Sequence, residues 1–188
     1  QLPRKERRRV IARDIAMIVQ EPSTGLDPSE QVGRQLIEAI PNEVYEGRWW
    51  KRFHWRKKQA IVLLHKVGIK NHQDIMGRYP YELTDGECQK IMIAMAIAAK
   101  PKLLIADEPT NDLDPITQSQ ILRLLSRMNQ INNTSILLIG HDLTTITQWA
   151  TRITVMYCGQ SVESADTQKI LGNPKHPYTA ALLKAMPD

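Results

Sequence analysis

A chain of 188 residues that is 42% hydrophobic and 24% charged can bury a full hydrophobic core, and its composition excludes a disordered or fibrous protein. The net charge of +5 is mild, so it is compatible with a membrane face or with nucleic acid and requires neither. No apolar run approaches the roughly 20 residues of a membrane-spanning helix, and two cysteines without metal-ligand spacing favour a reducing compartment.

The first predicted strand covers residues 15–19, an unbroken apolar run that one polar residue, Gln20, follows directly. Turn-forming residues come next, and we expect Asp27 or Ser29 to cap a helix over residues 30–40. On its own, a polar residue after an apolar run can simply mark the end of a strand. Gln20 becomes a candidate site residue if polar residues also follow the other predicted strands.

Residues 48–58 combine aromatic and basic side chains, with three of the chain's four tryptophans and its one phenylalanine. Such a stretch can bind nucleic acid through stacking and charge, or can lie at a membrane interface. We favour a third interpretation, a basic and partly buried helix start whose tryptophans pack within the fold. The reason is that the stretch leads directly into an amphipathic helix over residues 60–67.

A loop over residues 83–87 precedes a predicted helix over residues 86–99, which is apolar on all sides in its second half and is expected to be buried. The first amides of a helix have no partner within it and attract anions, so this loop is a candidate phosphate site. Asp85 would place a carboxylate close to a bound phosphate, and the competing interpretation, which is compatible with it, is that Asp85 caps the helix. The loop consists of Leu83, Thr84, Asp85, Gly86 and Glu87.

A second buried strand, over residues 103–106, runs into two adjacent acids, Asp107 and Glu108. An apolar strand that ends in Asp is the Walker B pattern, in which the carboxylate holds the Mg²⁺ that bridges nucleotide phosphates. A second acid directly after it can take a proton from water. The simpler interpretation is a strand followed by an acidic turn, because short patterns recur by chance.

A third buried strand, over residues 135–140, is followed by His141, which on its own can be a packing or capping residue. Between the second and third strands, Pro115 suits the start of a helix over residues 116–129. The last predicted elements are a hairpin that turns at residues 158–159, a short helix at 166–171 and a final helix at 180–186.

In chain order, Gln20, the loop over residues 83–87, the pair Asp107 and Glu108, and then His141 resemble the site motifs of ATP-binding-cassette (ABC) ATPases. The resemblance implies an α/β fold: a P-loop NTPase-type core, with a mostly parallel sheet flanked by helices, and an inserted helical lobe. It also implies ATP and Mg²⁺ as cofactors.

The same resemblance implies a role for each motif. Gln20 would touch Mg²⁺ or the attacking water, and Asp107 would anchor Mg²⁺. Glu108 would polarise the water, while His141 would hold the γ-phosphate and orient that water. Residues 83–87 would be the signature loop, which in the family binds ATP held by the opposite subunit of a head-to-tail dimer. The D-loop place is taken by Asn111, Asp112, Leu113 and Asp114.

The chain departs from the usual Leu-Ser-Gly-Gly-Gln signature, with Thr84 for the Ser, Asp85 for the first Gly and Glu87 for the Gln. A carboxylate about 4 Å from a phosphate charge repels it by about 1 kcal/mol in water-like surroundings. Asp112 likewise stands where the family usually has Ala in the D-loop. We therefore expect this subunit to complete a weakened ATP site and to pair with an unlike ATPase subunit, whose intact signature would carry turnover.

The sequence contains no G-x-x-x-x-G-K-[ST] phosphate-binding loop, which in ABC ATPases precedes the position of Gln20. We therefore expect residues 1–188 to be part of one nucleotide-binding domain, with the P-loop ahead of Gln1 and more chain after Asp188, and to hold ATP poorly alone. The expected parts are a helical lobe with the signature loop over residues 22–100, an ATPase core from residues 1–21 and 101–165, and a C-terminal helical segment over residues 166–188.

The stretch Asn-Pro-x-His-Pro-Tyr-Thr at residues 173–179 resembles the C-terminal region of oligopeptide and dipeptide importer ATPases. Within that family, the unusual signature loop and the tryptophan-rich residues 48–58 most resemble the branch that takes up antimicrobial peptides. The resemblance implies ATP hydrolysis that powers peptide import at the cytoplasmic face of the bacterial inner membrane.

The partners that the resemblance implies are inner-membrane permease subunits, whose loops would meet the helical lobe, a second ABC ATPase subunit and, indirectly, a periplasmic peptide-binding protein. One alternative is an ATP-binding regulatory subunit of another membrane system, such as potassium uptake, with little hydrolysis. An ABC ATPase that acts on nucleic acid fits poorly, because the C-terminal stretch is importer-like.

Overall fold

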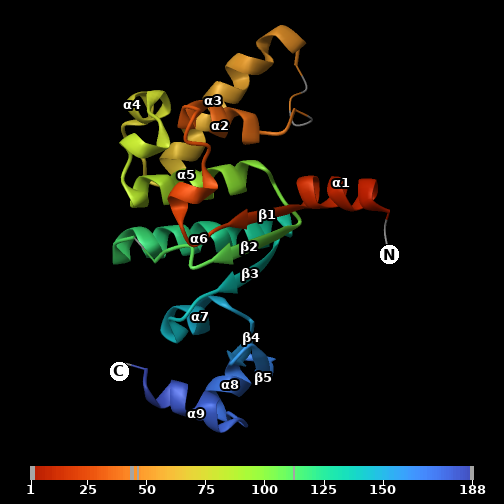
Figure 1. Ribbon diagram of the computed structural model, residues 1–188, viewed down its shortest axis with the longest axis vertical. Helices are drawn as coiled ribbons and strands as arrows, with labels where there is room; N and C mark the ends of the chain where they lie inside the picture. Colours follow the sequence, from red (N-terminus) through yellow and green to blue (C-terminus); the bar gives the residue numbers. More distant parts are fainter. Residues whose placement is uncertain (1–2, 43–44, 46, 112, 187–188) are drawn as a thin grey trace. The chain divides into compact units, whose positions relative to one another are not determined.

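The computed structural model describes residues 3–42, 45, 47–111 and 113–186 (Figure 1). The chain forms two compact units, Gln1–Ile139 and Gly140–Asp188. Their boundary falls inside the segment of residues 101–165 that was predicted to belong to the ATPase core. Among the described residues, no helix is both long and apolar enough to cross a lipid bilayer.

The first unit contains a three-stranded parallel sheet. Its strands, in spatial order, are β1 (Ile15–Ile18), β2 (Leu103–Asp107) and β3 (Ser135–Ile139). Each strand lies where an apolar run of the sequence predicted one, and the central strand β2 has fully buried side chains at alternate positions. The prediction of an α/β fold with a parallel sheet is confirmed.

The strand register brings the carboxyl ends of the three strands to one edge of the sheet. Ala106, near the end of β2, pairs with Ile18, the last residue of β1, and with Leu138 on β3. In open α/β sheets this is the edge at which ligands bind. The side chains that follow each strand are therefore gathered at the same place.

Helices flank the sheet (Figure 1). Helix α1 (Arg4–Asp14) leads into β1, α5 (Asp85–Ala98) packs against β1, and α6 (Pro115–Asn132) packs against β3. Helix α5 is buried on nearly all sides, with Ile91 and Ile93 no more than 1% exposed, as its uninterrupted apolar sequence predicts.

The other helices of the first unit pack around α5 and form a helical lobe. Both α2 (Val32–Ala39) and α3 (Arg52–Lys66) pack against α5, and α4 (His72–Gly77) packs against α2. Among the 3₁₀ turns of this unit, η1 (Pro22–Gly25) lies between β1 and α2, η3 (Trp49–Lys51) precedes α3, and η4 (Pro80–Glu82) lies between α4 and α5.

The prediction that Asp27 or Ser29 caps α2 is wrong. The helix begins at Val32 after Gln31, and no described side chain caps its first turn. Asp27 is four positions ahead of the cap residue, and its backbone N–H and carbonyl are bonded to the side chain of Gln35 at 2.9 and 2.8 Å. Its carboxylate instead accepts hydrogen bonds from the backbone N–H of Ser29 at 2.9 Å and from the Ser29 hydroxyl at 2.7 Å, which closes a local turn.

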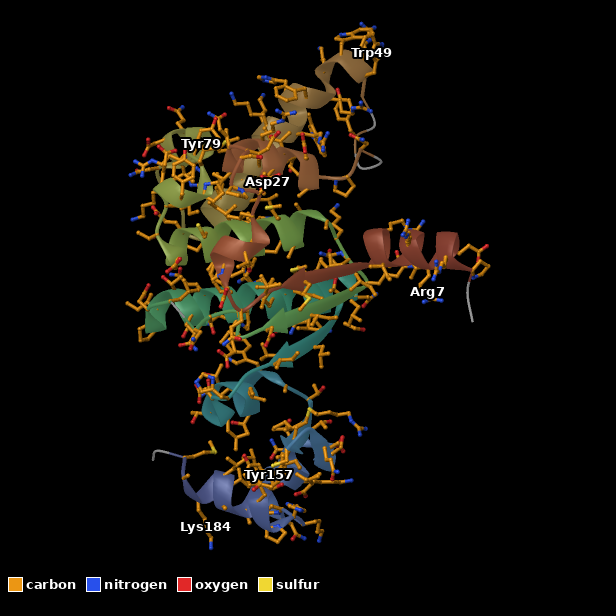
Figure 2. The ribbon with its side chains drawn as sticks, viewed as in Figure 1. Arg7, Asp27, Trp49, Tyr79, Tyr157 and Lys184 are labelled. Atoms are coloured by element: carbon orange, nitrogen blue, oxygen red, sulfur yellow. The ribbon has the colours of Figure 1, made fainter. Side chains whose placement is uncertain are left out.

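The tryptophans of residues 48–58 do not all pack within the lobe, and the interpretation favoured above is wrong for two of them. Trp49 is 76% exposed, Trp50 is 56% exposed and the neighbouring Phe53 is 67% exposed. Trp55 is partly buried and packs against the core. The reason is that α3 buries side chains in its second half, whereas the 3₁₀ turn η3 ahead of it lies at the tip of the lobe, where Figure 2 labels Trp49.

The second unit is built on an antiparallel hairpin of β4 (Arg152–Tyr157) and β5 (Gln160–Asp166). The predicted turn is confirmed: Cys158 and Gly159 have φ angles of 48° and 78°, the left-handed conformation that two-residue hairpin turns favour. A small core forms around Ile153, Val155 and Ile170. The helices of this unit are α7 (Leu143–Trp149), α8 (Thr167–Gly172) and α9 (Pro177–Lys184).

Candidate functional site

Two of the candidate site residues, which are 88 positions apart in the sequence, are hydrogen-bonded to each other. Gln20 Nε2 donates to Glu108 Oε2 at 3.1 Å. Gln20 follows β1 and Glu108 follows β2, so the parallel register explains why they meet. Because the nitrogen of the Gln20 amide points to Glu108, the carbonyl oxygen Oε1 of the same amide is the atom suited to bind a cation or water.

Glu108 has an unusual backbone conformation. Its φ angle is 44°, in the left-handed region, which costs a residue with a side chain about 1 kcal/mol or more. The backbone N–H of Glu108 donates to the carbonyl oxygen of Ile139, the last residue of β3, at 2.9 Å. This bond holds the residue in the turn. Strained residues of this kind concentrate at functional sites, which supports a functional role for this carboxylate.

Asp107 is the last residue of β2 and is partly buried. The backbone of Asp107 pairs with that of Ile139 in the sheet. This pairing fixes the strand end from which Glu108 follows. Mg²⁺ prefers oxygen ligands and takes one or two carboxylates together with phosphate and water oxygens. The carboxylate of Asp107 and the amide oxygen of Gln20 are ligands of the chemical type that Mg²⁺ takes beside a nucleotide, and their role in binding Mg²⁺ stays a prediction.

The loop over residues 83–87 starts α5 through a capping box. The Thr84 hydroxyl accepts a hydrogen bond from the backbone N–H of Glu87 at 3.3 Å. In return, Glu87 Oε2 accepts from the backbone N–H and the hydroxyl of Thr84, each at 3.0 Å. The prediction that Asp85 caps the helix is therefore wrong, because Asp85 is the first helical residue and Thr84 occupies the cap position.

Two carboxylates stand at the start of α5, where a phosphate would approach. Asp85 and Glu87 both lie in the first turn, a position that is favourable for the helix dipole. Burial is the main cause that raises the pKa of the nearby Cys88 thiol, and the charges of Asp85 and Glu87 raise it further. The same charges oppose the entry of an anion.

Gln89 is a residue that the sequence analysis did not single out. Its side chain is 1% exposed, and its Nε2 donates to the carbonyl oxygen of Pro109 at 2.6 Å. This bond ties the signature helix α5 to the turn that follows Glu108. A signal existed, because Gln89 lies three and four positions before Met92 and Ile93 and so shares their buried helix face.

The D-loop residues follow directly on this turn. The backbone N–H of Asn111 donates to the carbonyl oxygen of Glu108 at 3.3 Å, and that of Leu113 donates to the carbonyl oxygen of Thr110 at 3.3 Å. The D-loop therefore begins as a tight continuation of the strand end. The predicted site residue Asp112 lies outside the described residues.

Asp114 ends the D-loop and caps α6. Its carboxylate accepts a hydrogen bond from the backbone N–H of Thr117 at 3.0 Å, and hydrogen bonding by Thr117 lowers the pKa of Asp114. Pro115 is the first residue of the helix, as predicted, because a proline there loses no helical hydrogen bond.

His141 belongs to the second unit, where its side chain is exposed ahead of α7. The next residue, Asp142, caps that helix by accepting from the backbone N–H of Thr144 at 3.0 Å and from the Thr145 hydroxyl. The hydrogen bond from Thr145 is the main cause that lowers the pKa of Asp142. That His141 completes the site with Glu108 stays a prediction, because the two residues belong to different units.

Comparison with known proteins gives two family matches along the chain. Residues 1–111 match the model of the ABC transporter family, and residues 162–188 match that of the oligopeptide/dipeptide transporter C-terminal region. The second match includes residues 173–179, whose Pro-x-His-Pro-Tyr pattern predicted a resemblance to this C-terminal region.

Curated relatives extend the match over the whole chain. The peptide transport system ATP-binding protein SapD of Escherichia coli O6:H1 is 59% identical over 187 residues, which cover 100% of this chain and 57% of the relative. SapD of Haemophilus influenzae is 54% identical over 97% of this chain and 52% of the relative. The dipeptide transport ATP-binding protein DppD of Escherichia coli K12 is 46% identical over 98% of this chain and 55% of the relative. The chain thus spans about half the length of these relatives, and the resemblance to importer ATPases of the Sap branch is confirmed.

Solved structures have the same fold at low sequence identity. A dimeric ATP-binding cassette in a post-hydrolysis state bound to ADP and Pi superposes with a TM-score of 0.74 at 23% identity, over 89% of this chain and 68% of that chain. A second dimeric structure, of a bacterial ABC transporter cassette, superposes with a TM-score of 0.74 over 88% of this chain. The predicted ABC ATPase fold is confirmed.

Proposed function

This chain belongs to the ABC transporter family, and we propose that it is part of an ATP-binding subunit that powers the import of peptides, including antimicrobial peptides. The observation that carries the site assignment is the hydrogen bond between Gln20 and Glu108 at the carboxyl edge of the parallel sheet. The peptide cargo is supported by the names of the SapD and DppD relatives and by the family match of residues 162–188.

In this proposal ATP binds at the sheet edge, where Asp107 and Gln20 Oε1 would hold Mg²⁺. A bound Mg²⁺ would supply neutralisation of the negative charge on the phosphate oxygens. The Glu108 carboxylate accepts a proton from the attacking water, and its hydrogen bond from Gln20 Nε2 fixes the direction in which it faces. The His141 imidazole contacts the γ-phosphate and orients the same water.

The signature loop meets the nucleotide of another subunit. The structural neighbours were solved as dimers, which supports an assembly of two cassettes. In this chain Asp85 and Glu87 weaken the phosphate grip of the loop, so the pairing is with an unlike ATPase subunit whose signature is intact. The D-loop residues Asn111, Asp112, Leu113 and Asp114 lie in the contact with that subunit.

The division into parts follows the family. Residues 22–100 form the helical lobe with the signature loop, residues 1–21 and 101–165 belong to the ATPase core, and residues 166–188 form a C-terminal segment. The lobe faces the inner-membrane permease subunits at the cytoplasmic side of the bacterial inner membrane. A periplasmic peptide-binding protein delivers the cargo to the permease from the other side.

A regulatory ATP-binding subunit of a potassium uptake system is not favoured, because the relatives named above are peptide transport proteins. An ABC ATPase that acts on nucleic acid is disfavoured by the match of residues 162–188 to the peptide transporter region.

The test is reconstitution of the complete subunit with its permease and second ATPase in proteoliposomes. ATP hydrolysis and the uptake of a labelled cationic peptide are measured together. We expect hydrolysis to increase when the peptide and its binding protein are present. Hydrolysis that never responds to peptide, with no peptide uptake, would contradict the proposed transport function.

A further inference from the structure

The tip of the helical lobe carries an exposed cluster of aromatic and basic side chains that the proposed function does not use. We call residues 48–58 the aromatic-basic patch. Trp49, Trp50 and Phe53 are each more than half exposed, although large aromatic side chains are mostly covered in folded proteins. Trp55 packs on the core and lies 5.3 Å from Tyr45 between ring centroids, which fixes the patch to the lobe.

The charge of the patch is of one sign. No acidic residue occurs within residues 48–58. Among the described residues, no carboxylate forms an ion pair with any of its cations. Arg56 Nη2 donates to the backbone carbonyl of Glu38 at 2.9 Å, and the Arg48 guanidinium lies 5.3 Å from the centre of the Trp50 ring. The cations of the patch are Arg48, Lys51, Arg52, Arg56, Lys57 and Lys58.

The ring geometry distinguishes between the anionic partners that such a patch could bind. Trp49 and Trp50 meet edge to face, with centroids 5.7 Å apart and planes at 85°. Arg48 covers one face of Trp50. Binding of single-stranded nucleic acid uses open ring faces on which bases stack in succession, and this pair does not offer such a platform.

The position of the patch at the tip of the lobe favours a binding partner that presents a flat surface. Trp49 lies at the outer tip of the lobe, at the end of α3 that is farthest from the parallel sheet (Figure 2). A protruding turn with tryptophans at its tip and cations around it matches the layered structure of a bilayer surface, where indole rings lie among headgroups and cations pair with phosphates. We infer that the aromatic-basic patch is a docking site for an anionic phospholipid surface.

This inference goes beyond the proposed function and does not depend on it, because lipid binding requires neither nucleotide nor cargo. Each Lys or Arg near an anionic surface contributes about 1 kcal/mol, or about fivefold in binding. Burial of an exposed aromatic side chain contributes about tenfold or more.

The experiment measures binding of the chain to phosphatidylcholine vesicles with and without phosphatidylglycerol, by cosedimentation and by tryptophan emission. We expect binding to the phosphatidylglycerol vesicles, a shift of the emission to shorter wavelength, and weaker binding as salt rises. Trp49→Ala with Trp50→Ala should weaken binding about 100-fold or more. Neutralising three exposed cations should weaken it about 100-fold. These cations are changed in Lys51→Gln, Arg52→Gln and Lys57→Gln.

Matched controls lie elsewhere on the first unit. Tyr81→Ala removes an aromatic side chain that is 74% exposed, and Arg123→Gln with Arg127→Gln removes two exposed cations of α6. Both should leave vesicle binding unchanged, and circular dichroism should show that all variants are folded. Equal binding to both vesicle types, or equal losses in patch and control variants, would overturn the inference. Binding of poly(U) that depends on the patch, without vesicle binding, would overturn it in favour of nucleic acid.

Discussion

The carboxylate of Glu87 accepts hydrogen bonds from both the backbone N–H and the hydroxyl of Thr84, each at 3.0 Å. Thr84 stands where the family signature has Ser, and Glu87 stands where it has Gln. The two donors that Thr84 could offer to a phosphate are therefore satisfied inside the loop. The contact stabilises the start of α5 and at the same time places a negative charge at the candidate phosphate site.

Two different substitutions of Glu87 distinguish the effect of its charge on phosphate binding from the effect of its hydrogen bonds on the stability of α5. Glu87→Gln keeps an oxygen that can accept from Thr84 and removes the charge, so with Asp85→Gly we expect faster ATP hydrolysis by the assembled transporter. Removal of one charge repulsion of about 1 kcal/mol corresponds to about fivefold tighter phosphate binding. Glu87→Ala instead loses the two hydrogen bonds that Glu87 accepts from Thr84, while Thr84 remains the cap, and should lower the free energy of unfolding by about 0.5–1.5 kcal/mol. The control is Glu38→Gln on α2, which removes an exposed carboxylate outside the loop. An unchanged rate in the double variant that combines Asp85→Gly with Glu87→Gln would count against a weakened site.

The buried bond between Gln89 and Pro109 connects helix α5 to the turn after Asp107 and Glu108. Gln89→Leu leaves the Pro109 carbonyl without its donor in the interior, so we expect the free energy of unfolding in urea to fall by about 1–3 kcal/mol. The matched control is Gln59→Leu on α3, a partly exposed glutamine for which a change within about 0.5 kcal/mol is expected. If the two variants lost the same stability, the bond to Pro109 would not be the reason for the burial of Gln89.

The parts of the structure that the sequence predicted are those that depend on local pattern and on parallel topology. Three apolar runs predicted β1, β2 and β3, and the resemblance to ABC ATPases predicted that Gln20 and Glu108 belong to one site at the ends of these strands. Two of the predictions that failed, the caps by Asp27 or Ser29 and by Asp85, depend on where a helix begins. Asp85 and Thr84 are both good capping residues, and only the backbone conformation shows that Thr84 is the one ahead of the helix.

Long-range packing accounts for the features that the sequence did not predict. The exposure of Trp49 and Trp50 depends on how far the neighbouring helices extend along α3, which a periodic pattern does not encode. The bond from Gln89 to Pro109 joins residues 20 positions apart through a contact between a helix and a strand end. The left-handed conformation of Glu108 is likewise imposed by its bond to Ile139 on the next strand.

Glu108 is expected to be essential for turnover and dispensable for nucleotide binding. Glu108→Gln retains a side chain of the same size beside Gln20 but lacks the carboxylate that takes the proton. We expect hydrolysis by the full-length assembled transporter to fall by about 100-fold or more, with ATP still bound. Single-turnover hydrolysis and filter binding of labelled ATP separate the two effects. Glu6→Gln, which removes an exposed acid of α1, is the control and should leave the rate unchanged. Steady-state turnover retained in Glu108→Gln would exclude Glu108 as the base.

Glu163 makes the second unit sensitive to acid. Its carboxylate accepts hydrogen bonds from the backbone N–H groups of Lys175, at 2.8 Å, and His176, at 3.0 Å, and so ties β5 to the turn ahead of α9. The bond from Lys175, then that from His176, lowers the pKa of Glu163 below its usual 4.5. Because the folded pKa is the lower one, the unfolded chain binds more protons as pH falls. The stabilisation by Glu163 is therefore complete above pH 4.5 and is lost as pH falls below that value towards the folded pKa.

Glu163→Gln removes the charge and keeps an acceptor oxygen. We expect the amide protons of Lys175 and His176 to exchange faster in the variant than in the unaltered chain above pH 4.5, and the difference to shrink as pH falls below it. Comparing the two proteins at each pH removes the intrinsic pH dependence of exchange. Glu21→Gln in the first unit is the control and should leave these two amides unchanged. A difference in protection that stayed constant across this pH range would mean that the charge of Glu163 does not hold the turn.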